Sequence, residues 1–263
     1  MGDRLAIESA ADAAWLAAAG LASCADFIAG RRGTPVARTR TSQTQRVEIE
    51  VNGRREACYL KQFDYAERAT RHRLLPHKGA IEARNYRLLR SRVGAAVPDV
   101  IAHGSRRRFG RLVHGFILTR GVPDAEPLER WWPRHAAGGT AAGERLLAEL
   151  ASLVARMHAA GFYHVDLQWR NILVRDMLGG PTPVVLDSSR GGRRFLPWMR
   201  WHFRMRDLSS LDKSARTFLT RPQRFRWLRR YVAACDDATD ARGAARRLAR
   251  RVLADRRRKD GVP

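Results

Sequence analysis

Asp166, Asn171 and Asp187 have the side-chain types and the spacing of a phosphoryl-transfer site. Asp166 and Asn171 stand five positions apart, and Asp187 follows a second apolar run further along the chain. Carboxylate and amide oxygens are hard ligands that suit Mg²⁺, and the metal neutralises the charge of a nucleoside triphosphate. We expect Asn171 and Asp187 to be the metal ligands. Asp166 is expected to be the catalytic residue, which stays free of metal and accepts the proton of an attacking hydroxyl.

The apolar residues between these side chains predict the element that positions them. Residues 172–174 and 184–186 have the composition of two short strands, and the glycines and proline at 179–181 indicate the turn between them. Antiparallel pairing would bring Asn171 and Asp187 to the same end of a hairpin. The alternative is an ordinary surface hairpin that carries three polar residues at these positions by accident.

Lys61 and Glu82 are the candidates for a nucleotide-binding ion pair. Residues 47–51 alternate in polarity, Asn52-Gly53 is a strong hairpin turn, and Lys61 lies inside the apolar returning strand. A lysine there needs partners, which we expect to be the phosphates of ATP and Glu82 on the next helix. The alternatives are a lysine that extends to solvent at a strand edge and a first-turn glutamate favoured by the helix dipole.

Gly33 and Thr34 are candidates for a phosphate-covering loop, because they precede the hairpin in a basic, glycine-containing stretch at residues 30–38. Their main-chain amides could approach the phosphates of ATP, helped by Arg31 or Arg32. The stretch does not match the pattern G-x-G-x-x-G, and a plain basic loop is the alternative.

The charge of the chain indicates an anionic partner. The formal net charge is +24, and lysine appears only at four positions, so arginine carries nearly all of it. The arginines concentrate after Arg190 and are interleaved with tryptophan and phenylalanine, a composition that suits a lipid interface and also nucleic acid. We expect Arg190, Arg193 and Arg194 to contact an anionic substrate. The alternative is a solvated helical face over an ordinary core.

The remaining patterns predict the order of elements. We expect an alanine-rich helix over residues 5–22, a glycine- and proline-containing loop over 131–140, a strong helix over 144–160, helices from Ser209 onward, and a frayed tail at 256–259. Together with the hairpins, these patterns predict an α+β, protein-kinase-like fold of two lobes. A small antiparallel-sheet N-lobe would span residues 1–119, and a mostly helical C-lobe residues 120–263.

The cysteines and the apolar runs bear on the compartment. Cys24, Cys58 and Cys235 form neither a disulfide pattern nor a metal-binding spacing, which favours a reducing compartment. The apolar run at 13–22 is too short to span a bilayer and is preceded by the wrong charges for a signal peptide. We expect a cytoplasmic protein that could lie at the cytoplasmic face of the inner membrane.

These residues resemble the lipopolysaccharide core kinases of Gram-negative bacteria, the heptose and Kdo kinase group. The resemblance covers most of the chain beyond about residue 26. Its motifs are Gly30-Arg31-Arg32-Gly33-Thr34, Tyr59-Leu60-Lys61, Ile81-Glu82-Ala83-Arg84-Asn85, residues 157–166, 171–174 and 185–190, Arg206-Asp207-Leu208-Ser209-Ser210-Leu211 and residues 225–231. It implies ATP and Mg²⁺ as cofactors, an anionic lipopolysaccharide core glycolipid as acceptor, the anionic inner-membrane surface as a further partner, and no nucleic acid.

The chain departs from the common kinase pattern at two points. It has His164-Val165-Asp166 in place of His-Arg-Asp, and Asp187-Ser188-Ser189 in place of Asp-Phe-Gly. The missing arginine commonly pairs with a phosphorylated activation loop, so its absence argues against that form of control. A kinase of the lipopolysaccharide core is the leading hypothesis. The alternatives are another small-molecule or protein kinase, and an inactive pseudokinase or nucleic-acid-binding protein.

Overall fold

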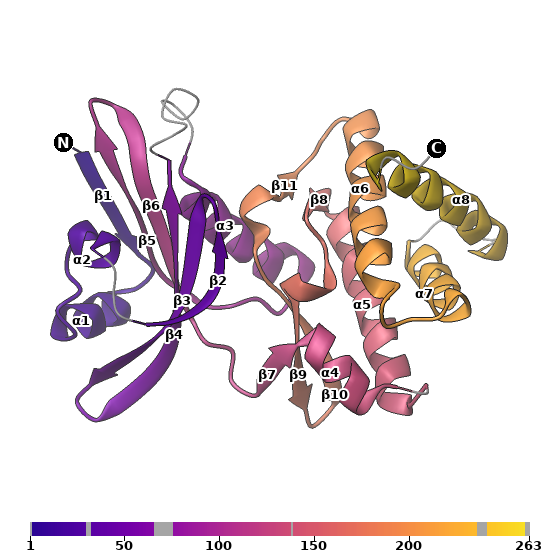
Figure 1. Cartoon of the computed structure of the whole chain (residues 1–263), viewed down its shortest axis with the longest axis horizontal. Coiled ribbons are helices and arrows are strands. Elements are labelled where there is room, and N and C mark those ends of the chain that lie inside the picture. Colours follow the sequence, from indigo (N-terminus) through magenta and orange to yellow (C-terminus); the bar gives the residue numbers. More distant parts are fainter. Residues whose placement is uncertain (1, 30–32, 66–75, 138, 236–240, 261–263) are drawn as a thin grey trace. The chain divides into compact units, whose positions relative to one another are not determined.

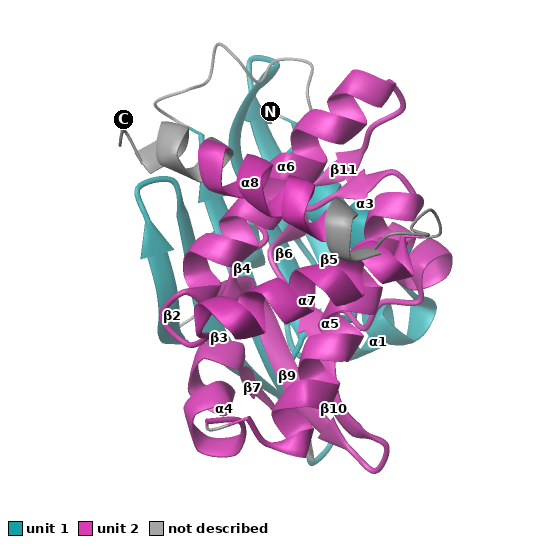
Figure 2. Ribbon diagram, turned by 90° about the vertical axis from the view of Figure 1, so that its right-hand side faces the viewer, with its two compact units in different colours: residues 1–87, 98–122 teal, residues 88–97, 123–263 magenta. Residues whose placement is uncertain are grey.

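A computed structural model describes residues 2–29, 33–65, 76–137, 139–235 and 241–260, and it divides the chain into two compact units (Figures 1 and 2). The first unit holds residues 1–87 and 98–122, and the second holds 88–97 and 123–263. The sequence placed one boundary between residues 119 and 120. The compact units divide the chain after Val122, and residues 88–97 belong to the second unit, where Ala96 bridges to Val184 and accepts the main-chain N–H of Val185. The expected lobe boundary stays a prediction.

The first unit is a six-stranded antiparallel sheet in the order β1-β5-β6-β4-β3-β2. Its strands are β1 (Gly2–Ile7), β2 (Thr34–Thr39), β3 (Ser42–Val51), β4 (Arg54–Asp64), β5 (Val100–Arg108) and β6 (Arg111–Arg120), and its helices are α1 (Ala10–Ala18), α2 (Cys24–Ile28) and α3 (Lys78–Leu88). The predicted β3–β4 hairpin is confirmed, with Asn52 and Gly53 both at positive φ in its turn.

The two faces of this sheet carry different side chains. Leu16 from α1 and Phe27 from α2 pack against Leu60 and Phe116, so these helices cover one face. Successive residues of a strand point to opposite faces. Lys61 therefore points away from that core and meets Glu82 of α3. The expected helix over residues 5–22 is wrong at its start, because Gly2–Ile7 is a strand that pairs with β5 at the sheet edge.

The second unit is mostly helical. It contains a π-helical turn η2 (Leu89–Val93), α4 (Leu128–His135), α5 (Ala141–Ala159), α6 (Pro197–Ala215), α7 (Arg221–Ala234), α8 (Ala241–Asp260), the 3₁₀ turns η3 (Trp169–Asn171) and η4 (Ser188–Arg190), and short strands β7 (Ala125–Pro127), β8 (Phe162–Tyr163), β9 (Ile172–Met177), β10 (Gly180–Val185) and β11 (Gly192–Arg193). The helix expected over 144–160 is confirmed as α5, which buries its apolar stripe of Leu146, Leu147, Leu150, Leu153, Val154 and Met157. That helix ends before Gly161, whose φ is +70°.

Three expectations for this unit are corrected. The loop expected over 131–140 begins as helix α4, which packs Trp132 against the ring of Trp169. Helix α6 begins at Pro197 rather than near Ser209, since proline at the first helical position has a suitable φ. Residues 256–259, expected to be frayed, belong to α8.

None of the helices in the described part of the chain has the length and apolar content that a bilayer crossing requires.

An apolar cavity of about 620 Å³ lies within the second unit, between α5, α6, α7 and α8. Its walls include Leu147, Leu150, Leu208, Leu211 and Trp227. Exposed arginines, Arg221, Arg246 and Arg250, also line it.

The start of α3, which carries Glu82, depends on a histidine. The Nδ1 atom of His77 accepts the N–H of Ala80 at 3.3 Å, and its main-chain oxygen accepts the N–H of Ile81. Burial lowers the pKa of His77 to about 4, and the charges of His103 and Arg107 act in the same direction. The folded protein therefore holds this imidazole neutral, with Nδ1 as an acceptor at the helix N-terminus.

We expect this histidine to make the protein less stable in acid. Between about pH 6.5 and 4, His77 is protonated in the unfolded chain and neutral in the folded protein. The free energy of unfolding therefore falls by up to about 3 kcal/mol as the pH is lowered. The His77→Asn variant keeps a capping acceptor that does not titrate. Its free energy of unfolding, measured with urea at several pH values, should therefore fall less steeply between about pH 6.5 and 4 than that of the native protein. Exposed His202→Asn is the control, and an equal slope in both variants would contradict the assignment.

Candidate active site

Lys61 and Glu82 form a buried ion pair in the first unit. Lys61 is in β4, between its neighbours Thr44 in β3 and Ile117 in β6. Its Nζ lies 3.2 Å from Oε2 of Glu82, and the two side chains are only 14% and 4% exposed. The hydroxyl of Tyr86 donates to the other carboxylate oxygen at 2.8 Å. Burying such a pair carries a desolvation penalty, so it is poor evidence for stability and better evidence for a role in binding.

The predicted contact between Lys61 and Glu82 is thus present, and their role toward ATP stays a prediction. The role of Gly33 and Thr34 toward the phosphates of ATP also stays a prediction. The N–H of Gly33 donates to Oε1 of Gln45 at 3.3 Å, and a Cβ at this position would lie 2.5 Å from the carbonyl oxygen of Arg46. Thr34 opens β2 opposite Arg46. Glycine is therefore explained by the close approach of β3, and Arg31 and Arg32 lie outside the described residues.

The loop that presents Asp166 in the second unit has a strained backbone. Val165 has a φ of +73°, a left-handed conformation that is unfavourable for a β-branched residue. Asp207 of α6, which is fully buried, accepts the N–H of His164 at 2.8 Å and that of Val165 at 2.7 Å. Nε of Arg206 donates to the carbonyl oxygen of Val165 at 3.1 Å. Two adjacent residues of α6 therefore hold the loop in this conformation.

A buried chain of hydrogen bonds supports Asp207. Nε2 of His158 lies 3.4 Å from the Asp207 carboxylate, and Nδ1 lies 2.8 Å from the hydroxyl of Tyr231. Burial lowers the pKa of His158 and raises the pKa of Tyr231, so both are neutral. The neutral imidazole then donates through Nε2 to Asp207 and accepts at Nδ1 from Tyr231. This arrangement links α5 and α7 to the Asp166 loop.

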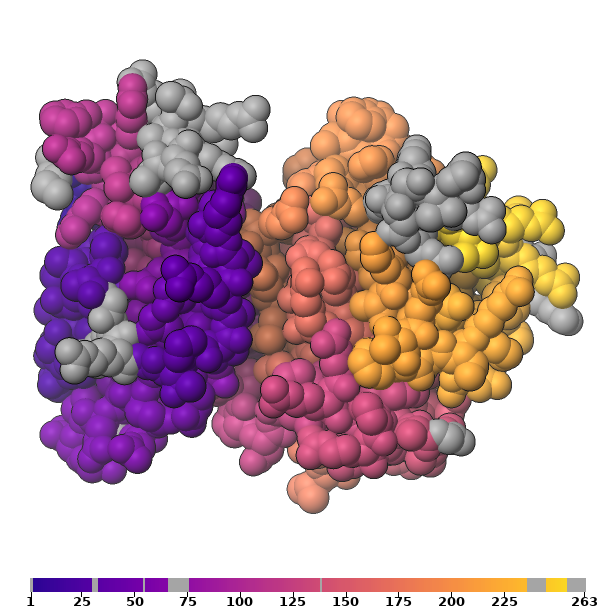
Figure 3. All heavy atoms as spheres, viewed as in Figure 1, coloured from indigo at the N-terminus to yellow at the C-terminus, as the bar shows by residue number. Residues whose placement is uncertain are grey.

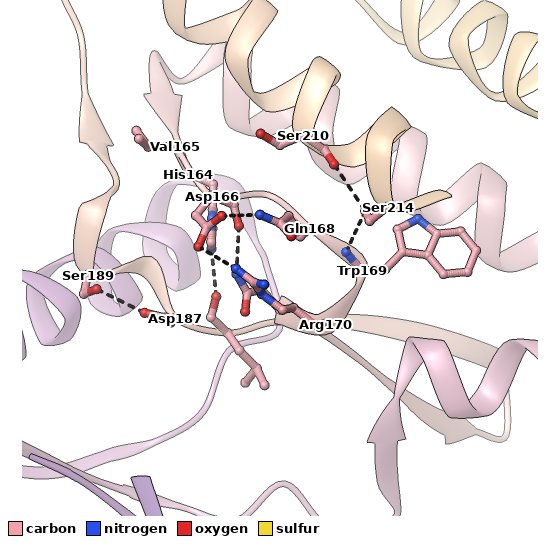
Figure 4. Close-up of polar contacts among 12 residues, drawn as sticks. His164, Val165, Asp166, Gln168, Trp169, Arg170, Asp187, Ser189, Ser210 and Ser214 are labelled. Atoms are coloured by element: carbon pink, nitrogen blue, oxygen red, sulfur yellow. Dashed lines mark hydrogen bonds and ion pairs between the residues drawn. The ribbon is translucent and has the colours of Figure 1, made fainter. Parts of the chain in front are cut away.

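Asp166 lies beside Gln168 and Arg170 in the second unit (Figure 4). The Asp166 carboxylate accepts a hydrogen bond from Nε2 of Gln168 at 2.7 Å, and a guanidinium nitrogen of Arg170 lies 3.5 Å from the same carboxylate. Nδ2 of Asn171 donates to the main-chain oxygen of Asp166 at 2.8 Å. That bond fixes the orientation of the Asn171 amide and turns its oxygen away from the carbonyl.

The hairpin predicted to carry Asn171 and Asp187 is confirmed. Strands β9 and β10 pair antiparallel with Ile172 opposite Val185, and the N–H of Leu186 donates to the carbonyl of Asn171 at 2.9 Å. Both predicted metal ligands therefore lie at the same end of the hairpin. Nε2 of His164 lies 2.7 Å from the carbonyl oxygen of Leu186, which ties the Asp166 loop to the residue before Asp187.

The chemistry of these donors fits Mg²⁺. Asp187 has a φ of +52° and accepts the hydroxyl of Ser189 at 3.0 Å. Within the described part of the chain, no three or more His, Cys, Asp and Glu side chains gather as a protein-only metal site. Magnesium in nucleotide sites takes one or two protein oxygens and completes its shell with phosphates and water. One carboxylate and one amide oxygen match that requirement.

The three arginines proposed as substrate contacts follow Asp187 directly. Arg190 ends η4 and is exposed, and Arg193 is exposed in β11. The guanidinium of Arg193 lies 4.9 Å from the Phe195 ring centroid, and that of Arg194 lies 4.3 Å from the Phe203 ring centroid. All three belong to the second unit, and their role toward a substrate stays a prediction.

The positioning residues Asp207, His158 and Tyr231 were not assigned from the sequence. Arg206 and Asp207 were noted only as part of a family motif. One feature could have revealed Asp207. The buried face of α6 includes Met205, Leu208 and Leu211, and an aspartate among those positions must have buried partners.

These two groups of residues have the side-chain types that a protein-kinase-like phosphotransferase uses. The sequence profile of the lipopolysaccharide kinase (Kdo/WaaP) family matches residues 32–231. The chain belongs to that family.

Solved structures agree with this fold. The structure of WaaP in complex with acyl carrier protein superposes with a TM-score of 0.68 at 22% identity, and the match covers 97% of each chain. The kinase domain of Mycobacterium tuberculosis PknI aligns at a TM-score of 0.42 and 12% identity over 83% of this chain and 93% of its own. No curated protein matches the sequence. The likeness to the WaaP structure confirms the expected protein-kinase-like α+β fold.

Proposed function

We propose that this protein transfers the γ-phosphoryl group of ATP to a sugar hydroxyl, on heptose or Kdo, of the lipopolysaccharide inner core. The family and two observations of the second unit support this function. The Asp166 loop is held by Asp207, and the β9–β10 hairpin sets Asn171 and Asp187 at one end. These are the parts that phosphoryl transfer requires: a proton acceptor and hard oxygen ligands on a rigid support.

In the proposed reaction the acceptor hydroxyl oxygen attacks the γ-phosphorus, and its proton passes to the Asp166 carboxylate. The bond from the γ-phosphorus to the bridging oxygen breaks, and ADP leaves. Asn171 and Asp187 would hold Mg²⁺, which supplies positive charge against the phosphate oxygens. Lys61, oriented by Glu82, binds the α- and β-phosphates. Gln168 and Arg170 orient the Asp166 carboxylate through the contacts described above.

The acceptor is proposed to be anionic because of the charge that follows Asp187. The charged residues between Asp187 and Asp207 are all arginines, at 190, 193, 194, 200, 204 and 206. Such a run attracts a phosphorylated acidic glycolipid and repels the cationic acceptors of aminoglycoside kinases. The requirement for ATP places the reaction on the cytoplasmic side of the inner membrane.

Substitution of Lys61 tests the nucleotide half of the proposal. We expect Lys61→Met to lower kcat/KM for phosphorylation of purified core glycolipid by about 10²–10³-fold, the effect of removing one strong electrostatic contact to the transition state. It should also remove the rise in melting temperature that Mg²⁺-ATP gives the native protein. Exposed Lys213→Met is the matched control.

The acceptor itself is identified in a panel with labelled ATP. Label is expected on lipopolysaccharide core sugar, and not on a protein substrate or an aminoglycoside. Native activity in Lys61→Met, or labelling of another acceptor only, would contradict the proposed function.

A further inference from the structure

The start of α6 exposes large apolar side chains that a folded protein usually buries. Four side chains within seven consecutive residues are exposed: Phe195 at 71%, Leu196 at 51%, Trp198 at 68% and Trp201 at 42%. The first turns of α6 form the surface at one end of the second unit, drawn in orange (Figures 1 and 3). We call these four residues the α6 apolar patch. Single exposed apolar residues are common in proteins, but a contiguous cluster marks a binding surface.

The helix geometry gathers the patch on one side. Trp198 and Trp201 are three residues apart in α6, so they lie along the same stripe of the helix. Phe195 and Leu196 immediately precede the helix. Further along, Met205, Leu208 and Leu211 of the same helix are buried in the core of the second unit. The apolar residues at the start of α6 are therefore not needed for that core.

Arginines surround the patch and contact its aromatic rings. The guanidinium of Arg193 lies over Phe195, and that of Arg251, from α8, lies 5.1 Å from the ring centroid of Trp201. Arg194 lies over Phe203, which follows the patch in α6. Arg193 of β11 and Arg251 of α8 thus place positive charge beside two exposed aromatic rings of the patch, and Arg194, which follows β11, adds charge next to it. No acidic residue occurs between Asp187 and Asp207 to offset that charge.

We propose that the α6 apolar patch is a membrane-docking surface that inserts into the interface of an anionic phospholipid bilayer. Tryptophan and phenylalanine occupy the boundary between headgroups and acyl chains, whereas arginines pair with the anionic headgroups above it. The arginine stems lie along the apolar surface and leave the guanidinium groups at the headgroup level. Apolar contact and charge each contribute, and stable attachment to a membrane requires such a combination of two signals.

Membrane docking is independent of catalysis, because it requires neither ATP nor a glycolipid. It is measured by flotation of the full chain with vesicles in the absence of nucleotide. Vesicles of phosphatidylethanolamine with phosphatidylglycerol should carry the protein, and vesicles of phosphatidylcholine should carry much less. The double substitution Trp198→Ser with Trp201→Ser is expected to weaken partitioning into anionic vesicles by about tenfold or more. The substitution Leu178→Ser, at an exposed position in the β9–β10 turn, is the control and should bind like the native chain.

Two further measurements locate the contact. Acyl chains brominated near the headgroup should quench tryptophan fluorescence in the native chain, and the double variant should lose most of this quenching. Arg251→Gln should weaken binding to anionic vesicles and reduce its dependence on salt, while binding to phosphatidylcholine stays unchanged. Circular dichroism and melting temperature of each variant confirm that the fold is intact.

The proposal is overturned if the double variant and Leu178→Ser float equally, or if the native chain does not bind anionic vesicles. It is also overturned if the double substitution leaves vesicle binding intact and instead abolishes self-association, measured by sedimentation. The proposal is likewise overturned if the double substitution abolishes only the binding of an acidic protein such as acyl carrier protein. Because phosphoryl transfer to a detergent-dispersed acceptor is measured separately, failure of docking and failure of the proposed kinase activity give different results.

Discussion

Replacing Asp166 with asparagine is expected to reduce the rate of phosphoryl transfer by about 10²–10⁴-fold, the usual contribution of a general base. Asparagine has nearly the same shape, and its amide oxygen still accepts a hydrogen bond from Gln168. It has no carboxylate to take the proton of the acceptor hydroxyl. The loop should therefore stay folded while the chemical step fails. Initial rates with saturating ATP and core glycolipid measure the effect.

A matched substitution separates loss of the base from loss of a negative charge. Glu149 lies on the exposed side of α5, and Glu149→Gln makes the same change from carboxylate to amide outside the site. This variant should retain native turnover and native melting temperature. If Asp166→Asn is as active as Glu149→Gln, the assignment of the catalytic residue is incorrect.

Asp207→Asn is expected to lower the free energy of unfolding by about 2–5 kcal/mol and to reduce kcat as well. The native carboxylate accepts two main-chain N–H groups and faces His158 at 0% exposure. An asparagine in its place presents one oxygen, and its amide hydrogens oppose at least one of those donors. The unfavourable φ of Val165 then loses part of its support, and the Asp166 carboxylate is no longer held in place.

The comparison variant for Asp207 is on the same helix. Asp212 forms a partly buried ion pair with Arg224, so Asp212→Asn should lower the free energy of unfolding by about 1–2 kcal/mol and leave kcat unchanged. Chemical denaturation gives the stabilities, and turnover is measured at a temperature at which all the variants are folded. A loss of kcat without change in KM for ATP distinguishes a positioning role from general loss of structure. Equal effects of the two substitutions would show that Asp207 has no special role.

The elements that the sequence predicted correctly are those defined by local patterns. The β3–β4 hairpin follows from alternation and the Asn52-Gly53 turn, and helix α5 from its apolar stripe. The β9–β10 hairpin follows in the same way, although its turn is at Leu178-Gly179 rather than at 179–181. Each pattern is strong over a short stretch, and tertiary packing agrees with the local preference.

The elements that were predicted incorrectly depend on contacts between distant residues. Strand β1 exists because Gly2–Ile7 pairs with β5, about a hundred positions later, and its own residues do not alternate clearly. Helix α4 contains Pro133, which usually interrupts a helix, yet Trp131 and Trp132 are buried in the core of the second unit. The support of Val165 by Asp207 also joins residues far apart in the chain, so no local pattern reveals it.

The phosphate content of the lipopolysaccharide core, in cells that carry Asp166→Asn as their only copy, tests the proposed function most directly. Mass spectrometry of isolated core oligosaccharide should show the loss of one phosphate relative to cells with the native protein. Cells that carry Glu149→Gln should retain it. A core that keeps its full phosphate content in the Asp166→Asn cells would contradict the proposal that this chain is a kinase of the inner core.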